Sequence, residues 1–308
     1  MPALMDPRIK LRHLNALVET VRQGGVGRAG EELGMTQPAI SKALAELEDI
    51  LGVALFDRSR RALSLTVHGE MFERFARGGL ATLRQGLDAI LEAQSGVAEL
   101  AFGALPTVSA NVVPRALALF AGTPLACRSR VESGPSPYLL ELLRSAAIEF
   151  VVGRMAQPSA MDGLAFEQLY AEALALVVRP GHPLARGEAT LDAIAGHQLV
   201  MPPREAIIRP AVDALLIAGG VVAATDTVET VSNSLGRSYT LMTDAVWIIS
   251  HGVVARDLES GALVRLPIDV AGTRGAIGIT TRAGAELSQP ARAMLDCVRQ
   301  AVLSPRTP

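Results

Sequence analysis

The stretch Thr36–Leu51, TQPAISKALAELEDIL, constrains the fold most, because it reads as one amphipathic helix with both ends marked. Aliphatic side chains recur at intervals of four, three and four residues, which places them on one helix face: Ile40, Leu44, Leu47 and Leu51. Thr36 can cap the first turn, which tolerates Pro38, and Gly52 can end the helix in the left-handed conformation. One face of this helix therefore packs, and the other is free to contact a partner.

Two shorter helical patterns precede this helix. An apolar stripe from Leu11 to Val21 predicts a first helix that ends near Gly24, and residues 27–33 predict a short second helix. Gly34 and Met35 then form a turn of the length found in helix-turn-helix units. This part of the chain is therefore predicted to be a small DNA-reading module.

The segment after Gly52 predicts a two-stranded wing with a basic tip. Leu63 and Leu65 alternate with polar residues, and a cluster of arginines precedes them: Arg58, Arg60 and Arg61. Taken alone, three arginines usually mark a solvated loop. Beside a helix-turn-helix, we favour contacts with DNA phosphates instead.

Residues 66–94 return to a helical pattern with a narrow apolar stripe. Its members are Leu80, Leu83, Leu87 and Leu91. A long helix with such a seam, and no domain of its own to cover it, usually pairs with a second copy of itself. We expect a linker and dimerisation helix, with a bend allowed at Gly78 and Gly79.

Beyond Gly96 short apolar runs alternate with helical segments. The predicted strands are ELAFGAL, LACRSRV, IEFVVG, ALALVV, QLVM, DTVETV, AVWII and AIGIT. The predicted helices span residues 112–120, 138–146, 206–218, 234–241 and 287–303. This alternation favours parallel sheets covered by helices, in which ligands bind beyond the carboxyl ends of strands and against helix N-termini.

Composition restricts the remaining options. The chain has 308 residues, enough for about two domains, and no apolar run reaches the length needed to span a bilayer. The N-terminus has no signal-peptide pattern, so we expect a cytoplasmic protein. The net charge of −2 does not by itself indicate a polyanionic partner such as DNA, so evidence for one must come from local clusters of basic residues. Cys127, Cys297 and the histidines lack metal-ligand spacing, and no cofactor or metal is predicted.

Two segments resemble the LysR-type transcriptional regulators. They are TQPAISKALAELEDILGVALFDRSRRALSLTVHGE, which is long and specific, and VVRPGHPLA at Val177–Ala185. The resemblance implies an α/β fold with an all-α N-terminal part: a winged helix-turn-helix, a linker helix and an effector domain of two subdomains like those of periplasmic binding proteins. Residues 102–109, 229–239 and 243–254 look like the branch containing protocatechuate-operon and sugar-binding-protein regulators, a less specific match.

The implied domain boundaries follow from this resemblance. Residues 1–66 form the DNA-binding domain, 67–96 the linker helix and 97–308 the effector domain. Within the effector domain, subdomain one comprises 97–170 and 276–308, and subdomain two comprises 171–275.

The resemblance also implies that the start of the helix at Thr36–Leu51 faces the major groove. A glutamine amide can pair with adenine, while hydroxyl and ammonium groups can bond phosphates or base edges. Acidic residues near the helix end would repel phosphate. The predicted DNA contacts are Arg28, Thr36, Gln37, Pro38, Ser41, Lys42, Arg58, Arg60 and Arg61. Ala45 departs from the family, and Gly27 and Gly30 predict a weaker second helix.

For the effector pocket, hydroxyls at helix starts and one arginine after a strand are the candidates. They are Thr107, Ser109, Ser136 and Arg154 from one subdomain, and Met201, Pro202 and Ser232 from the other. Simple helix capping is an equal alternative for the hydroxyl residues. For Arg154 we favour a ligand role, because a guanidinium can hold a carboxylate bidentately.

The expected partners follow from these assignments. They are double-stranded DNA carrying an interrupted palindrome, a carboxylated aromatic or muconate-type effector, a second copy of the chain in a homodimer or homotetramer, and RNA polymerase. A sugar or sugar acid is the alternative effector. We expect a regulator of aromatic catabolism that is not an enzyme.

Rival functions have weaker support. Residues 25–30 match the dinucleotide pattern GxGxxG, but the segment before them has a helical period where that motif needs a strand. A solute-binding protein would share the C-terminal fold without the DNA-reading module. Hydrolase and phosphotransfer motifs are not found in the sequence.

Overall fold

The protein is described here from a computed structural model that covers residues 6–57, 63–95, 98–187, 189–221 and 226–303. It divides into two compact units, the chain up to Gln94 and most of the chain from Ser95 onward. No helix in these residues is long and apolar enough to cross a membrane.

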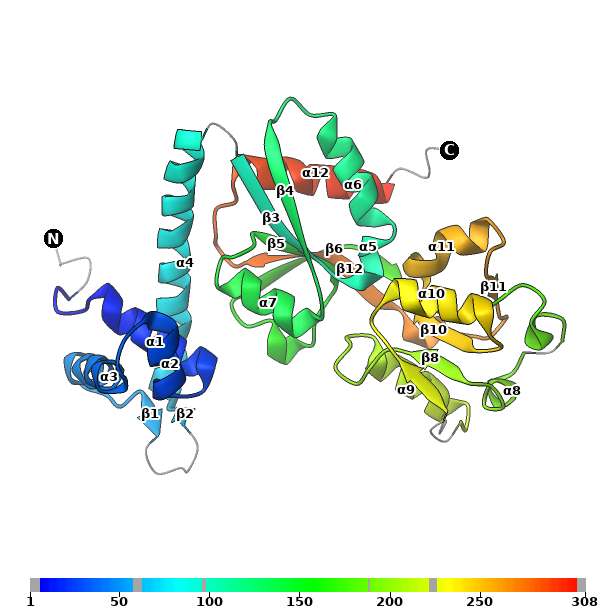
Figure 1. The fold of residues 1–308 in the computed structure, drawn as a ribbon, viewed down its shortest axis with the longest axis horizontal. Helices are drawn as coiled ribbons and strands as arrows, with labels where there is room; N and C mark the ends of the chain where they lie inside the picture. Colours follow the sequence, from blue (N-terminus) through cyan, green and yellow to red (C-terminus); the bar gives the residue numbers. More distant parts are fainter. Residues whose placement is uncertain (1–5, 58–62, 96–97, 188, 222–225, 304–308) are drawn as a thin grey trace. The chain divides into compact units, whose positions relative to one another are not determined.

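The first unit contains the predicted helices and wing (Figure 1). Its helices are α1 (Leu11–Gln23), α2 (Val26–Leu33), α3 (Gln37–Leu51) and α4 (Val67–Ser95). Strands β1 (Phe56–Asp57) and β2 (Ser64–Leu65) pair in antiparallel register and form the wing. The expected winged helix-turn-helix is therefore confirmed.

Helix α3 packs as its sequence predicts. Ile40, Leu44 and Leu47 are buried in the core between α1, α2 and α3, together with Leu17. Thr36 Oγ accepts a hydrogen bond of 3.4 Å from the backbone N–H of Ala39, so the expected cap is present. At the other end Gly52 has φ of 68° and donates its N–H to the Glu48 carbonyl.

The glycines of α2 differ in their surroundings. A Cβ on Gly30 would lie 2.6 Å from the Met35 carbonyl oxygen, because the turn between α2 and α3 folds back on the helix. The Met35 N–H donates to the Gly30 carbonyl at 2.8 Å, which holds this turn in place. Gly27 meets nothing within 4 Å. Thus Gly30 is required by backbone packing, whereas Gly27 is not.

Helix α4 exposes a longer apolar stripe than the sequence predicts. Leu83 and Leu87 are exposed as expected, but Leu80 packs against the core of the first unit. The other large apolar side chains exposed on α4 are Val67, Met71, Phe75 and Ile90. The Leu91 side chain lies outside the described residues. The stripe therefore extends toward the N-terminal end of the helix.

The described part of the second unit contains two five-stranded sheets, whose lobes we call lobe one and lobe two. Lobe one has strand order β4-β3-β5-β12-β6, and its strands are β3 (Ala98–Ala104), β4 (Cys127–Ser133), β5 (Phe150–Arg154), β6 (Leu164–Glu172) and β12 (Gly275–Arg282). Lobe two has strand order β11-β7-β10-β8-β9, and its strands are β7 (Leu174–Val178), β8 (Leu199–Met201), β9 (Thr227–Glu229), β10 (Val246–Ser250) and β11 (Val264–Arg265).

The prediction of parallel sheets is wrong in part, because both sheets are mixed. β12 runs antiparallel to β5 and β6, and β7 runs antiparallel to β10 and β11. The prediction also omitted β6 and β11. β6 is a half-buried edge strand with interspersed polar residues, and β11 has two residues, so neither produces a continuous apolar run.

Helices cover the sheets of both lobes (Figure 1). In lobe one they are α5 (Pro106–Ser109), α6 (Val112–Ala121), α7 (Ser136–Arg144) and α12 (Gln289–Leu303). In lobe two they are α8 (Leu191–Ile194), α9 (Arg209–Ala218), α10 (Asn233–Met242) and α11 (His251–Glu259). Short 3-10 turns span Pro158–Ala160, Pro183–Ala185 and Ala271–Thr273. The sequence prediction omitted α5, α8 and α11.

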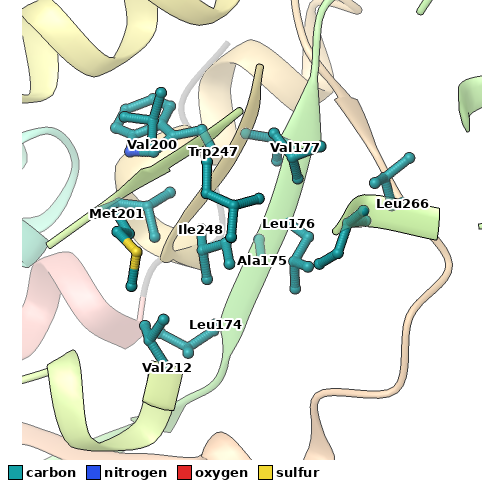
Figure 2. Close-up of a cluster of buried hydrophobic side chains, with 14 of the residues drawn as sticks. Leu174, Ala175, Leu176, Val177, Val200, Met201, Val212, Trp247, Ile248 and Leu266 are labelled. Carbon is teal, nitrogen blue, oxygen red and sulfur yellow. The ribbon is translucent and has the colours of Figure 1, made fainter. Parts of the chain in front are cut away.

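Each lobe has its own apolar core. α6 and α12 lie together over one face of the lobe one sheet, where Phe102 and Phe150 stack at 4.9 Å between ring centroids. In lobe two the buried Trp247 lies near Val200 of β8 and Val177 of β7, while Val212 of α9 lies beside Leu174 in the same apolar cluster (Figure 2). The chain crosses between the lobes from β6 into β7 and again before β12. The domain boundaries expected from the sequence stay predictions.

The two α2 glycines provide a matched test. We expect Gly30→Ala to lower the free energy of unfolding by about 1–3 kcal/mol, because its methyl group would overlap backbone. Gly27→Ala should be neutral or stabilise by up to about 1 kcal/mol, because alanine favours helix and the position is open. Urea denaturation of both variants measures the difference, and equal destabilisation would contradict the packing explanation.

Candidate DNA-reading face and effector site

The first two turns of α3 present a polar face to solvent. Gln37, Pro38, Ser41 and Lys42 are all exposed, as is the capping Thr36. Ala45 is half-buried, so the free face narrows toward the helix centre. The arrangement offers an amide, a hydroxyl and an ammonium group at a helix N-terminus, a combination suited to base edges and phosphates.

The acidic end of α3 has a structural use that the sequence did not reveal. Glu46 accepts hydrogen bonds from Arg12 at 2.8 Å and pairs with the buried His13 at 3.1 Å, and the Arg12 contact holds the Glu46 pKa below its usual range. Glu48 Oε1 accepts the backbone N–H groups of Leu55 at 2.7 Å and Phe56 at 3.2 Å. These carboxylates therefore tie α3 to α1 and to the wing.

The remaining predicted DNA contacts are basic. Arg28 is exposed on α2 and donates to the Gly24 carbonyl at 3.4 Å. The wing-tip residues Arg58, Arg60 and Arg61 lie outside the described residues. Among the predicted contacts that the structure describes, those at the start of α3 and its cap lie together.

The dinucleotide alternative lacks its structural context. Gly25 is the N-cap of α2, and the element before it is the helix α1. A phosphate-binding turn of the GxGxxG type follows a strand.

Of the lobe one hydroxyl candidates, Thr107 and Ser136 lie at helix starts, whereas Ser109 is the last residue of α5. Thr107 is buried in α5, and its Oγ has no hydrogen-bond partner among the described residues. Ser109 Oγ donates to the Leu105 carbonyl at 3.0 Å, which is a local backbone contact. Ser136 is the first residue of α7 and is buried. Of the three, Thr107 has the clearest capacity for a further contact.

Arg154 is the last residue of β5 and is half-buried. Its Nη2 donates to the Thr273 carbonyl at 2.8 Å, while Nη1 is buried without a partner among the described residues. Burial lowers the Arg154 pKa, and the nearby Glu172 carboxylate opposes that shift. The guanidinium is thus anchored by one nitrogen and has another available for an acceptor.

The lobe two candidates differ from one another. Met201 points into the lobe two core (Figure 2), so its side chain serves packing. Pro202 is buried, and its carbonyl accepts from Arg209 Nη1 at 2.8 Å. Ser232 is exposed and caps α10 by accepting the Leu235 N–H at 3.3 Å. The neighbouring Asn233 reaches across the lobes and donates to the Pro106 carbonyl at 2.9 Å.

A buried carboxyl at the lobe junction was missed by sequence reasoning. Glu172 ends β6, is 8% exposed, and accepts the backbone N–H of Gly252 at the start of α11. Burial raises the pKa of Glu172 to about 7, against the Gly252 hydrogen bond and the Arg154 charge, which lower it. Glu172 Oε1, Ser250 Oγ and His251 Nδ1 lack partners among the described residues. A charged residue directly before the apolar run ALALVV was the available signal.

Comparison with known proteins identifies the architecture. Residues 11–70 match the family described as bacterial regulatory helix-turn-helix protein, lysR family, and residues 93–303 match the LysR substrate binding domain. The chain belongs to the LysR family. Its resemblance to that family, first seen in the residues of α3 and the wing, is confirmed.

Individual members of the LysR family match over nearly the whole chain. The transcriptional regulator PcaQ of Agrobacterium fabrum is 41% identical over 300 residues, covering 97% of this chain and 96% of PcaQ. The uncharacterized regulator YdcI of Escherichia coli is 35% identical, covering 97% and 98%. The crystal structure of full-length CbnR in complex with its target DNA has a TM-score of 0.54 at 21% identity, covering 95% and 100%. The last likeness shows a shared fold.

The Glu172 carboxyl predicts a pH dependence of stability. Its pKa rises from 4.5 in ordinary surroundings to about 7 in the folded protein, so the folded chain holds a proton that the unfolded chain has lost. Stability should therefore fall as pH rises through this window, by roughly 3 kcal/mol. Glu172→Gln cannot titrate and should gain stability relative to the wild type between pH 5 and pH 8. Denaturation curves at both pH values measure this, with the exposed Glu286→Gln as the control.

Proposed function

We propose that this LysR-family member is a transcriptional regulator that binds double-stranded DNA through the start of α3. The supporting observation is that Gln37, Pro38, Ser41 and Lys42 are exposed together on a capped helix whose other face is fixed in the core. The acidic end is occupied by contacts to α1 and the wing. Arg28, Arg58, Arg60 and Arg61 are proposed to add phosphate contacts.

The protein is proposed to act on DNA as paired copies. The exposed stripe on α4 consists of Val67, Met71, Phe75, Leu83, Leu87 and Ile90. Exposed large apolar side chains at such spacing on a long helix are typical of a helix-pairing face. Two DNA-reading heads joined in this way would read an interrupted palindrome, and further contacts between effector domains would make a homotetramer. RNA polymerase is a proposed further partner at the promoter.

The effector is proposed to be a small carboxylated compound of the aromatic or muconate type. Arg154 supports this, because its Nη1 is buried without a partner among the described residues, as is the Thr107 hydroxyl of the same lobe. Ser109, Ser136, Pro202 and Ser232 are proposed to complete the pocket, with Met201 supporting it from the core. A sugar acid remains the alternative.

The effector is proposed to work by shifting populations of two arrangements of lobe one and lobe two. The contact from Asn233 to the Pro106 carbonyl already joins α10 to α5, next to the proposed effector residues. A ligand that favours one arrangement would change how the paired heads meet DNA. The protein is thus proposed to function by binding, in the cytoplasm, and not by catalysis.

Lys42 provides the test of DNA binding. We expect Lys42→Ala to weaken retardation of a fragment from the gene's own upstream region and to lower the slope of log affinity against log salt by about 1, because one phosphate contact is lost. Arg204→Ala removes the same charge from an exposed position in the effector region and is the control. Identical salt slopes for Lys42→Ala and the wild type would rule out this contact.

Arg154 provides the test of effector class. In a thermal-shift screen we expect 3,4-dihydroxybenzoate or cis,cis-muconate to raise the Tm by several degrees when present far above the Kd. Arg154→Ala should abolish that shift and leave operator retardation intact, while the exposed neighbour Arg274→Ala should retain both. A shift with gluconate in place of these acids would favour the sugar-acid alternative. Loss of both readouts in Arg154→Ala would indicate that the arginine is needed for folding.

A further inference from the structure

The junction between the lobes gathers buried polar groups around one carboxyl. Glu172 is the last residue of β6, directly before the crossing into β7 of lobe two. In lobe one it is paired with Gly275 of β12, whose Cα hydrogens face the Arg154 guanidinium. A Cβ on Gly252 would lie 2.5 Å from Glu172 Oε2 and 3.4 Å from the Thr107 carbonyl. Glycine at 252 therefore permits α11, α5 and this carboxyl to meet.

Both crossings are held by groups at this junction. The Arg154 guanidinium donates to the Thr273 carbonyl, and Thr273 Oγ accepts the Leu174 N–H at 2.9 Å. The His251 N–H donates to the Ala173 carbonyl at 3.1 Å, directly after Glu172. The start of α11 is thus attached to the first crossing by one backbone bond and by the Glu172 carboxyl.

The charges around Glu172 come from few elements. Arg154 on β5 attracts the carboxylate. Burial, and after it the Glu172 charge, raises the pKa of Tyr170 on the same strand as Glu172. α5 has no titratable side chain between Pro106 and Ser109. α11 begins with His251, whose pKa is lowered by burial and by Arg265 and raised by Glu259. The remaining charged residues of α11 are Arg256 and Asp257, and Asp257 is paired with Arg237.

The ionised and protonated carboxyl make different contacts here. When ionised, Glu172 accepts a charge-assisted bond from Gly252 at the positive end of α11 and attracts Arg154. A proton taken from solvent weakens both attractions and makes the carboxyl a donor. It also removes the cost of burying a charge, which is the larger effect, so the protonated form is held more firmly. Thr107 Oγ and Ser250 Oγ are buried acceptors without partners in the described part of the chain.

We propose that Glu172 is a positioning residue whose protonation state sets how firmly the start of α11 is held at the lobe junction, so that the response of this regulator varies with pH. The change reaches the proposed effector residues through α5, because the Thr107 carbonyl lies next to Gly252 at the start of α11. Asn233 of α10 also contacts α5, at the Pro106 carbonyl. The functional consequence rests on the proposed regulator function, whereas the structural change at the junction does not.

Hydrogen exchange of the full-length protein tests the structural change. After correction for the intrinsic chemical rate, we expect protection of the peptide spanning residues 250–256 to fall at least threefold from pH 6 to pH 8 in the wild type, because opening hydrates a carboxylate whose burial is unfavourable. Glu172→Gln should show no such change, and Glu286→Gln should follow the wild type. A wild type without pH dependence, or Glu172→Gln that keeps it, overturns the proposal.

A measurement on the wild type covers the case in which Glu172→Gln does not fold. Ordinary carboxyls are ionised above pH 6, so an infrared band of a protonated carboxyl that disappears with a midpoint near pH 7 would report Glu172. Absence of that band overturns the proposal. Operator retardation is recorded at each pH in parallel. Failure to bind DNA under every condition would refute the proposed function, while the exchange result would still decide the role of Glu172.

Discussion

The fold of the effector region depends on the two places where the chain crosses between its sheets. At both crossings buried polar groups need hydrogen bonds or an opposite charge. At the first crossing Glu172 accepts the Gly252 N–H, and at the second the Thr273 carbonyl accepts from Arg154. Burial of a carboxyl and a guanidinium is costly unless they attract one another or find hydrogen bonds, and both conditions are met only in part. The junction therefore joins the lobes and also responds to any group or proton that changes this balance.

In the DNA-reading unit, the two ends of helix α3 have different roles. The first turns of α3 are exposed and polar, and its buried stripe fixes their orientation against α1 and α2. Its acidic end, which would repel phosphate, is used for contacts to Arg12, His13 and the first strand of the wing. One helix can bind DNA with its first turns and hold the domain together with its last ones, because repulsion between carboxylates and DNA phosphates is strong only at short range.

Much of the fold follows from local patterns. Periodicity identified α1, α3 and α4, and capping chemistry placed the ends of α3 at Thr36 and Gly52. The edge strand β6 was not predicted, because its half-buried, partly polar pattern resembles a loop. The antiparallel strands of the mixed sheets were not predicted either, because strand direction is decided by chain crossings and not by composition. For the candidate site, the sequence correctly placed Thr107, Ser136 and Ser232 near helix starts, and their role toward an effector stays a prediction. Glu172 was not, because its burial depends on residues some 80 positions later, around Gly252.

The sequence by itself determined that this chain has a capped amphipathic helix with one polar face, a wing, a long helix with an exposed apolar seam and an alternating α/β region. These features depend on residues near one another in the chain, so their physical causes can be read from spacing and cap chemistry. Only the tertiary structure decided that Gly30 must lack a side chain, that Met201 packs in a core, and that Glu172, Arg154 and the start of α11 meet at one junction. Those outcomes depend on close approach between distant segments, and steric contact and desolvation exist only once the segments have come together.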